Sequence, residues 1–535
     1  MQRTAKEYLK ELIEEVVKGN PELREAGDIV VLPTAKEEFG EFYSNIAFKM
    51  KKGFRSPKDA AEYLRTRILG LNPLFIEKIE VSNGFLNFFL KNTFYYDVIS
   101  EVSRGDTRSL TPSPIKKKVL IEFVSANPTG PLTIAHGRQA AFGEALARIL
   151  KYAGCDVVKE YYINDAGRQI KLLGESLKAR YSQLQGINYP IPEGGYEGDY
   201  LVDIAKKVPD GNIEFDRFAM EDILKDISGD LKRFGVSFDR WVSETGFFED
   251  GSVDKLLKEF EEKGLIYFDE GSKWFKSSVY GDEKDRVVVK KDGSYTYLAS
   301  DIAYHKDKID RGYDTLINII GPDHHGYIPR LNAVVETLGF DPKQLKCIIV
   351  QLTTLYRGEE KLSMSTRKGQ FISLKQLMDE VGPDASKFFF IFRKVESHLD
   401  FDLALAKKES TENPVYYLQY AYVRMKHILE FAEERGVDLA GADLSLLKEA
   451  EELSLIRHIA KFPDAVESAV NSYGVHLLAE YLLDIAKLFH SYYHKCRVVS
   501  EEERLSAARL ALTKALLNVF SLSLNLLNIS LPEKM

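Results

Sequence analysis

The chain has 535 residues, of which 44% are hydrophobic and 29% are charged, and its formal net charge is −8. This length exceeds what one hydrophobic core supports and indicates about three domains. The net negative charge excludes a protein whose whole surface binds nucleic acid. It does not exclude a single basic face that binds nucleic acid, because binding depends on the local potential. No apolar run is expected to span a membrane and the N-terminus shows no signal-peptide core, so we expect a cytoplasmic protein with no membrane partner.

The cysteines indicate neither a metal site nor a disulfide framework. Cys155, Cys347 and Cys496 are far apart, and none belongs to a CxxC pair. The adjacent His324 and His325 have no cysteine or spaced acidic partner nearby in the sequence, which disfavours a metal there too. We therefore expect no protein-bound structural metal.

Residues 1–105 are predicted to form a small α/β domain. A helix is expected over 4–18, where apolar residues recur at helical spacing, and a second helix near 57–70. Residues 76–90 alternate between apolar and polar side chains in the manner of a β-hairpin. The polar stretch 104–114 is predicted to be a linker to the next domain.

Residues 115–400 are predicted to form a Rossmann-like α/β domain around a parallel sheet. A buried strand begins within 116–125, a helix follows over 137–153, and 157–164 is the next strand. A strand–helix–strand order of this kind forms a parallel, right-handed crossover unit.

The sheet is expected to resume at 315–320 and 347–352, both of which are apolar runs. The irregular and largely helical stretch of about 166–295 between the two halves is therefore predicted to be an insertion. Residues 411–535 are almost entirely amphipathic helix, which indicates an all-α bundle.

The segment PTGPLTIAHGR at 128–138 offers a site for phosphate. Pro128 and Pro131 stiffen an extended loop, while Gly130 permits a close approach. His136 falls in the first turn of a helix, where free backbone N–H groups and the helix dipole favour an anion. An imidazole there can donate to an α-phosphate as charge builds during attack. Alone, the segment is equally compatible with an ordinary capped turn.

The segment SMSTRKG at 363–369 starts 230 residues after Thr133 and alternates cations with hydroxyls. Such a loop can neutralise a departing pyrophosphate, although a lone stretch is more often a solvated charged loop. Between the two segments, Gly321 ends a strand where a backbone must approach a ligand, and the Asp323 carboxylate suits a ribose diol. The pair, in this order, indicates an enzyme that attacks the α-phosphate of ATP.

The two segments resemble the signatures of class I arginyl-tRNA synthetases of bacterial type. TIAH at 133–136 is similar to the HIGH signature, and SMSTR at 363–367 is similar to the KMSKS loop. Four further stretches resemble the same family: YYINDAG at 161–167, GPDHHGY at 321–327, SHLDFD at 397–402 and NPVYYLQYA at 413–421. The resemblance implies ATP-dependent attachment of L-arginine to tRNA(Arg) through an arginyl-adenylate, with Mg²⁺ accompanying ATP, by a monomer.

Both signatures depart from the family pattern. Thr133 replaces the first His, and Ala135 replaces the Gly of HIGH. In one register of KMSKS, Ser363 replaces the first Lys; in the other, Lys361 keeps it and Met364 replaces the second. The resemblance implies catalytic roles for Thr133, His136, Lys361, Ser363, Ser365, Arg367 and Lys368. It implies ATP contacts at Asn127, Pro128, Gly130, Thr133, Ala135, His136, Gly321, Asp323 and Met364.

The stretches 121–127 and 294–301 resemble the arginine-binding segments of the family. They imply that Glu122 and Asp301 bind the guanidinium, that Tyr297 lies beside it, and that Asn127 and His324 hold the other end of arginine. A planar fork of donors is best matched by fixed carboxylates, and their loss of partners would reject uncharged analogues. An alternative for Glu122 is an ion pair with one of the lysines at 116–118.

The resemblance also implies two tRNA contacts outside the catalytic domain. The N-terminal domain would contact the tRNA elbow through Phe85 and Asn87, and the bundle would read the anticodon through Tyr493 and Arg497. Aromatic and cationic side chains together stack splayed bases and hold phosphate. A Phe at such a position is more often part of the core, and simple helix packing is the alternative for Tyr493 and Arg497. Another class I ligase, a small-molecule nucleotidyltransferase and a non-catalytic tRNA-binding homologue are the alternatives.

Overall fold

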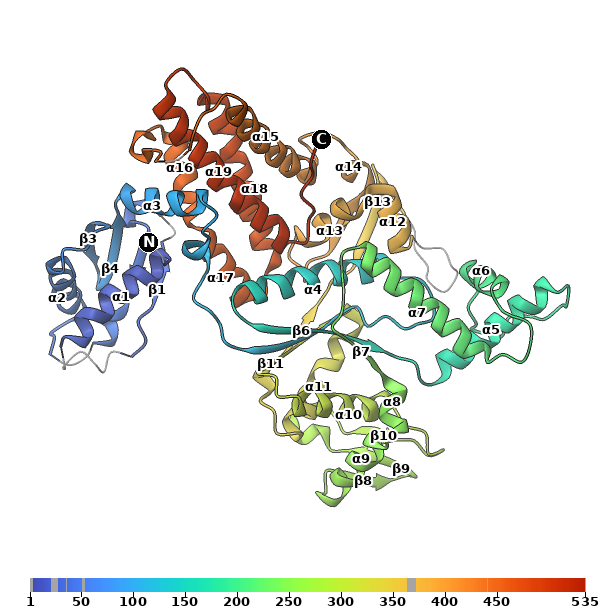
Figure 1. Cartoon of the computed structure of the whole chain (residues 1–535). Helices are drawn as coiled ribbons and strands as arrows, with labels where there is room; N and C mark the ends of the chain where they lie inside the picture. The colour runs from blue at the N-terminus through green and yellow to red at the C-terminus, as the bar shows by residue number, and fades with distance from the viewer. Residues whose placement is uncertain are drawn as a thin grey trace.

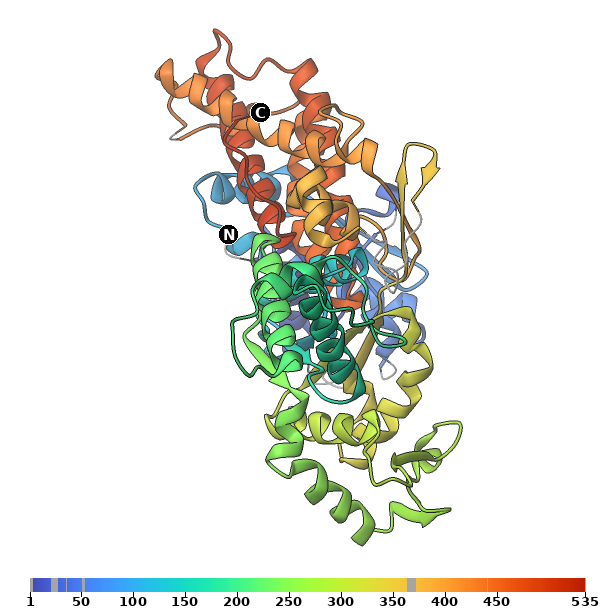
Figure 2. The same ribbon diagram turned by 90° about the vertical axis from the view of Figure 1, so that its right-hand side faces the viewer.

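Three domains follow one another along the chain (Figure 1). The computed structural model describes residues 3–20, 27–34, 36–50, 53–362, 372–439 and 441–534. The N-terminal α/β domain lies beside the C-terminal helical bundle, and the central domain carries two lobes that project away from the bundle. In the turned view the molecule is elongated, with the bundle at one end and one lobe at the other (Figure 2).

The N-terminal domain is an antiparallel sheet of order β1-β2-β4-β3 packed against two helices. The bounds are α1 Ala5–Lys18, β1 Val31–Pro33, β2 Phe42–Ser44, α2 Pro57–Gly70, β3 Ile76–Ser82 and β4 Phe85–Leu90. Helix α1 begins at a capping box between Thr4 and Glu7. Helix α2 begins after the N-cap Ser56 with proline at its first position, which is a strong start signal. The predicted helices and hairpin are confirmed.

The centre of the molecule is a five-stranded parallel sheet of order β12-β11-β5-β6-β7. Its strands are β5 Lys118–Glu122, β6 Asp156–Ile163, β7 Arg240–Ser243, β11 Thr315–Ile320 and β12 Leu345–Ile349. The order reverses at β5, since the chain first adds β6 and β7 on one side and later β11 and β12 on the other. A ligand crevice is expected at the carboxyl ends of the strands at such a point.

Helix α4 (Ile134–Tyr152) connects β5 to β6 and packs closely over the end of β5. A Cβ added at Gly143 would lie 2.4 Å from the ring of Phe123, so only glycine permits this approach. The predicted strand–helix–strand unit, and with it the parallel-sheet fold class, is confirmed.

The stretch predicted as one insertion is interrupted by β7, which joins the main sheet. The first lobe contains α5 Arg168–Leu184, α6 Tyr200–Lys206 and α7 Phe215–Arg233. The second contains α8 Glu244–Glu249, α9 Ser252–Glu262, β8 Ile266–Asp269, β9 Ser272–Phe275, β10 Arg286–Val289 and α10 Tyr297–Asp310. The sequence gives little sign of β7 because Val242 is the one buried residue of this edge strand.

A second small sheet of order β14-β13-β15 follows the main one. The bounds after β11 are 3-10 helix η6 Pro322–Tyr327, α11 Ile328–Thr337, β13 Thr353–Arg357, β14 Glu360–Lys361, α12 Leu374–Val381, α13 Pro383–Ile391, β15 Leu399–Asp402 and α14 Leu403–Ala406. Other short 3-10 turns lie at Glu37–Phe39, Ile46–Lys49, Arg108–Leu110, Ser277–Tyr280, Pro342–Gln344 and Leu444–Leu446.

The C-terminal domain is a helical bundle, as predicted. Its helices are α15 Pro414–Glu434, α16 Ala450–Ala460, α17 Phe462–Ser472, α18 Val475–Lys495 and α19 Glu503–Leu526. Contrary to the sequence-based expectation, α19 is long and apolar enough to cross a membrane. It is mostly buried between α15, α18 and the helix α3 (Asn92–Ser103), as is typical of the core helix of a bundle.

Candidate active site

The turn into α4 fixes the hydrogen-bonding state of His136. Thr133 is the N-cap of α4, and its backbone N–H donates to His136 Nδ1 over 3.2 Å. A ring nitrogen that accepts a hydrogen bond carries no proton, so the proton of the neutral ring lies on Nε2. Burial lowers the pKa of His136 to about 4. At neutral pH the side chain is therefore an uncharged donor through Nε2, at a helix N-terminus that favours anions.

The backbone just before this turn is strained. Val124 and Ser125 have φ values of +67° and +39°, a region that is unusual for any residue with a side chain and most of all for valine. The Ser125 hydroxyl donates to Glu122 over 3.1 Å and accepts from the backbone N–H of Tyr162 over 3.1 Å. The turn thus joins the ends of β5 and β6 and leaves Asn127 exposed beyond them.

The residues on either side of the second predicted segment are described by the structure. The residues Ser363, Met364, Ser365, Arg367 and Lys368 lie outside the described residues. Before them, Lys361 is exposed on β14, which pairs with β13 in a hairpin. After them, Ser373 forms an antiparallel bridge with Thr133, and the backbone N–H of Leu374 donates to the carbonyl of Leu132 over 2.8 Å. The structure therefore brings the residues that follow the second segment against the first segment.

Three carboxylates converge beside β5 from three elements. Glu122 ends β5, Asp301 lies in the second turn of α10, and Glu244 begins α8. Asp301 accepts from the hydroxyl of Tyr327, and Ser300 donates to Glu244 over 2.6 Å. Burial raises the pKa of Asp301 to about 7, against the Tyr327 hydrogen bond, and the charges of Glu122 and Glu244 add to the rise. Burial also raises the pKa of Glu244.

One buried ammonium, that of Lys308, offsets part of the negative charge of this acidic pocket. The ammonium of Lys308, which is fully buried, lies 2.5 Å from Glu122 Oε2, 3.2 Å from Asn318 Oδ1 and 4.0 Å from the ring centroid of Tyr304. The expected alternative, a pair between Glu122 and a lysine at 116–118, is wrong. Lys118 begins β5, so its Cα lies roughly 13 Å from that of Glu122 at about 3.3 Å per residue, and the other two lysines precede the strand.

A chain of hydrogen bonds connects Glu122 to Asp301 through buried side chains. Asn318, which holds Lys308, donates through Nδ2 to His305 Nε2 over 3.3 Å. His305 Nδ1 then donates to the backbone carbonyl of Asp301 over 2.8 Å. Burial lowers the pKa of His305 to about 3, so this ring is neutral. The chain ties β5, β11 and α10 into one support for the two carboxylates.

The pocket has an excess of acceptors over donors. Glu244 Oε2 is buried beside the hydroxyl of Tyr162, and neither atom has a hydrogen bond of normal geometry within the described part of the chain. Three carboxylates face one ammonium, which leaves a deficit of positive charge in a poorly solvated place. A planar cation with several N–H donors fits that deficit.

The other predicted site residues lie at the same edge of the sheet. Tyr297, at the start of α10, is 58% exposed, and Asp323 and His324 are exposed on η6 directly after β11. Gly321 has open space where a side chain would project, since its nearest contact there is Gln139 at 3.9 Å. Gly130 instead accommodates Tyr200, whose hydroxyl would lie 3.3 Å from an added Cβ.

Known protein families match this architecture domain by domain. Residues 3–90 match the arginyl-tRNA synthetase N-terminal domain, residues 99–194 and 198–390 match the class I (R) catalytic domain, and residues 418–535 match the DALR anticodon-binding domain. The arginine–tRNA ligase of Citrifermentans bemidjiense is 45% identical over 520 residues, covering 94% of each chain. The chain belongs to the class I arginyl-tRNA synthetase family.

Other arginyl-tRNA synthetases are also similar to this chain in sequence or in fold. The arginine–tRNA ligase of Shouchella clausii is 43% identical over 525 residues, covering 95% of this chain and 94% of that one. The Thermus thermophilus arginyl-tRNA synthetase structure is 22% identical and has a TM-score of 0.75, covering 99% of this chain and 100% of that one. At that identity the likeness shows a shared fold.

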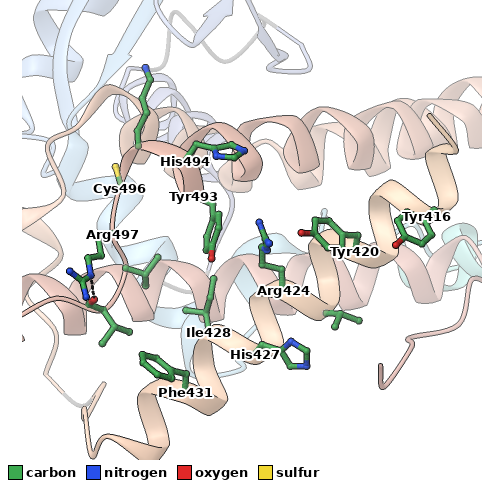
Figure 3. Close-up of a pocket in the computed structure, with 14 residues that line it drawn as sticks. Tyr416, Tyr420, Arg424, His427, Ile428, Phe431, Tyr493, His494, Cys496 and Arg497 are labelled. Carbon is green, nitrogen blue, oxygen red and sulfur yellow. Dashed lines mark hydrogen bonds between the residues drawn. The ribbon is translucent and has the colours of Figure 1, made fainter. Parts of the chain in front are cut away.

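The anticodon-binding domain of this synthetase carries a groove of about 730 Å³ between α15 and the end of α18 (Figure 3). In it, the guanidinium of Arg424 lies between two rings, 4.7 Å from the centroid of Tyr420 and 4.4 Å from that of Tyr493. Arg497 lines the groove as well, and its Nε donates to the carbonyl of Val499 over 3.1 Å. The sequence predicted Tyr493 and Arg497 but missed Arg424.

In the N-terminal domain, the two predicted tRNA contacts differ in exposure. Phe85 is 36% exposed, and its ring packs against Phe48 and Tyr43 with centroid distances of 4.9 and 5.8 Å. Asn87 is only 5% exposed and lies within the sheet, between β2 and β3. Of the two, only Phe85 offers a surface to a ligand in this conformation.

Three residues of the pocket, Glu244, Lys308 and Tyr327, were not predicted from the sequence. A glutamate at a helix N-terminus, as Glu244 is, is common because it complements the helix dipole. A lysine in the last turn of a helix, as Lys308 is in α10, is equally ordinary. Tyr327 does carry a sequence signal, since it ends the GPDHHGY stretch that resembles the family.

Proposed function

We propose that this synthetase attaches L-arginine to tRNA(Arg) in two steps, with ATP as the energy source. An oxygen of the arginine carboxylate attacks the α-phosphorus of ATP, the bond to the β-phosphate breaks, and pyrophosphate leaves. The terminal ribose hydroxyl of the tRNA then attacks the arginyl carbonyl, and AMP leaves. The observation that carries the proposal is the meeting of a phosphate-binding turn and a cation-binding pocket at one edge of one sheet.

On the ATP side, His136 donates from Nε2 to an α-phosphate oxygen. This donor is uncharged and fixed by Thr133, so it needs no reorganisation as negative charge grows on the phosphate. Lys361 and the segment that follows it neutralise the pyrophosphate, and Mg²⁺ enters with ATP as part of that substrate. Ala135, Gly130, Pro128, Gly321 and Asp323 line the nucleotide.

On the arginine side, Glu122, Asp301 and Glu244 receive the guanidinium, and Tyr297 covers it. The arginine side chain binds as a cation. Its positive charge offsets the negative charge of the carboxylates that Lys308 leaves unpaired. Asn127 and His324, at the open side of the pocket, hold the α-amino and carboxylate end near His136. An uncharged analogue such as citrulline leaves carboxylates unpaired and is rejected.

On the tRNA side, the groove of the anticodon-binding domain stacks unpaired bases, and Phe85 contacts the elbow. The Tyr420–Arg424–Tyr493 sandwich supports the first role, because flat cationic and aromatic surfaces bind splayed bases. Arg497, exposed at the rim, holds phosphate. We expect the enzyme to act as a monomer in the cytoplasm.

Arginine-dependent exchange of pyrophosphate into ATP, measured with and without tRNA(Arg), tests the proposed function. We expect exchange that requires arginine and that tRNA(Arg) stimulates, because a lysine is missing from the KMSKS pattern in either register. Exchange that depends on another amino acid or on a small-molecule acceptor would contradict the proposal. No exchange under any condition would indicate a non-catalytic tRNA-binding protein.

A further inference from the structure

Arg138 is a fully buried arginine that binds only main-chain carbonyls. It lies on α4, two residues after His136, and none of its side chain is exposed. Nη1 donates to the carbonyls of Gln351 and Leu352 over 2.8 and 3.4 Å, and Nη2 donates to those of Lys394 and Ser397 over 3.2 and 2.9 Å. Within the described residues no carboxylate lies within ion-pair distance of it.

The four carbonyls belong to two loops that begin neighbouring strands. Gln351 and Leu352 directly precede β13, and residues 394–397 precede β15, which pairs with β13 in parallel. The two loops also bond to each other, since the backbone N–H of Gln351 donates to the carbonyl of Val395 over 3.0 Å. Arg138 therefore holds together the two loops that lead into the sheet of the β13–β14 hairpin.

The same stretch of chain holds the far side of that hairpin. Beyond it, Ser373 bridges to Thr133, and Leu374 bonds to the carbonyl of Leu132. The fit is close, because a Cβ added at Gly137 would lie 2.7 Å from the side chain of Leu374. Residues 132–138, which contain the proposed phosphate-binding turn, thus contact the chain both before and after the β13–β14 hairpin.

We infer that Arg138 is a positioning residue for the activation of arginine, because it fixes the β13–β14 hairpin, and with it Lys361, against the turn that holds His136. Its role depends on shape rather than on charge compensation. A guanidinium presents its donors in a fixed plane and can bridge carbonyls of two loops at once, whereas an ammonium cannot span them in the same geometry. Misplacement of a catalytic group by about 1 Å lowers rates on the order of a hundredfold.

The inference rests on the proposed function, and pyrophosphate exchange with tRNA(Arg) present tests both. The variants are Arg138→Met, which removes the donors, and Arg138→Lys, which keeps the charge and a folded core. The control is Lys387→Met, a buried cation of α13 that also bonds to a main-chain carbonyl, that of Asn528, and whose helix packs on the same α4. Rates are normalised to active sites counted by isothermal titration with arginine, a binding measurement that does not depend on the chemical step.

We expect Arg138→Met to lower kcat for exchange at least tenfold and Arg138→Lys to lower it by a smaller factor. The KM for arginine should stay within twofold, because the acidic pocket does not contact Arg138. Lys387→Met should keep kcat per active site within twofold even though its melting temperature falls. A purely structural role would lower the melting temperature without lowering kcat per active site, whereas a positioning role lowers kcat as well.

Either of two results would overturn the inference. One is wild-type kcat per active site in Arg138→Met; the other is a loss that follows melting temperature alike in Arg138→Met and Lys387→Met. If the wild-type protein shows no arginine-dependent exchange, the proposed function fails instead. Wild-type exchange combined with a fully active Arg138→Met variant refutes the inference alone.

Discussion

At the scale of single residues, the acidic pocket explains why arginine would bind here as a cation. Asp301 is a carboxyl with a pKa of about 7, so it is half protonated in the free protein near neutral pH. A guanidinium favours the ionised form, and its arrival therefore releases a proton below about pH 7. His305, the nearest imidazole in the supporting chain, has a pKa of about 3 and does not titrate in this range.

The affinity for arginine should therefore fall as pH is lowered through 7. With a pKa of about 7, the ionised fraction of Asp301 drops about tenfold between pH 8 and pH 6, and we expect a similar drop in the association constant. Isothermal titration with arginine over this range measures it. Asp301→Asn should bind weakly and without this pH dependence; a wild-type affinity that is flat from pH 6 to 8 would show that Asp301 is not a ligand.

Replacement of Lys308 by Met should weaken both the fold and the arginine site. The change leaves Glu122, whose side chain is 16% exposed, without its partner, and breaking a largely buried pair from one side lowers the free energy of unfolding by up to about 3 kcal/mol. Glu122 would also lose the ammonium that holds its carboxylate in place, so the arginine site should lose its fixed geometry. Denaturant unfolding and arginine titration give the two quantities.

Two variants serve as controls for Lys308. Lys308→Arg keeps a cation at Glu122 and should retain most of the affinity. Lys118→Met removes a lysine from the opposite end of the same strand and should change neither quantity. Equal effects of Lys308→Met and Lys118→Met would disprove the special role of the buried ammonium.

At the scale of elements, the sequence predicts well what local rules decide. Helix α2 begins at a serine cap followed by proline, and strand β11 is largely apolar, so both were predicted with the bounds that the structure shows. Strand β7 was missed because an edge strand with one buried residue carries no periodic signal. Local spacing cannot reveal partners that only the fold brings together, such as Lys308 with Glu122 or Arg138 with four distant carbonyls.

The groove between α15 and α18 is predicted to bind tRNA(Arg) independently of the arginine site. Arg424→Ala should raise the KM for tRNA(Arg) about tenfold and leave the KM for arginine unchanged, since loss of one stacking contact weakens binding by about 1–3 kcal/mol. Steady-state aminoacylation with varied tRNA measures this. Lys426→Ala, on the same helix and paired with Glu430, is the control. Unchanged tRNA kinetics in Arg424→Ala would place the anticodon elsewhere.

At the scale of the whole molecule, the two domains that flank the catalytic domain are fixed to each other. Lys6 of α1 lies 2.6 Å from both Asp464 and Glu467 of α17. The hydroxyl of Tyr96 on α3 donates to the carbonyl of Leu447 over 3.0 Å. Contacts at the elbow and at the anticodon would therefore be set at a fixed spacing, with the active site between the bundle and the projecting lobes (Figures 1 and 2).

We propose one arrangement above all, in which β5 and α4 present a turn for the phosphate of ATP next to an acidic pocket for the guanidinium of arginine. A crystal structure with arginine and a non-hydrolysable ATP analogue tests it most directly. We predict guanidinium nitrogens within hydrogen-bond distance of Asp301 and at least one of Glu122 and Glu244, with an α-phosphate oxygen at His136 Nε2. A guanidinium that points away from these carboxylates, or a nucleotide bound apart from His136, would contradict the account.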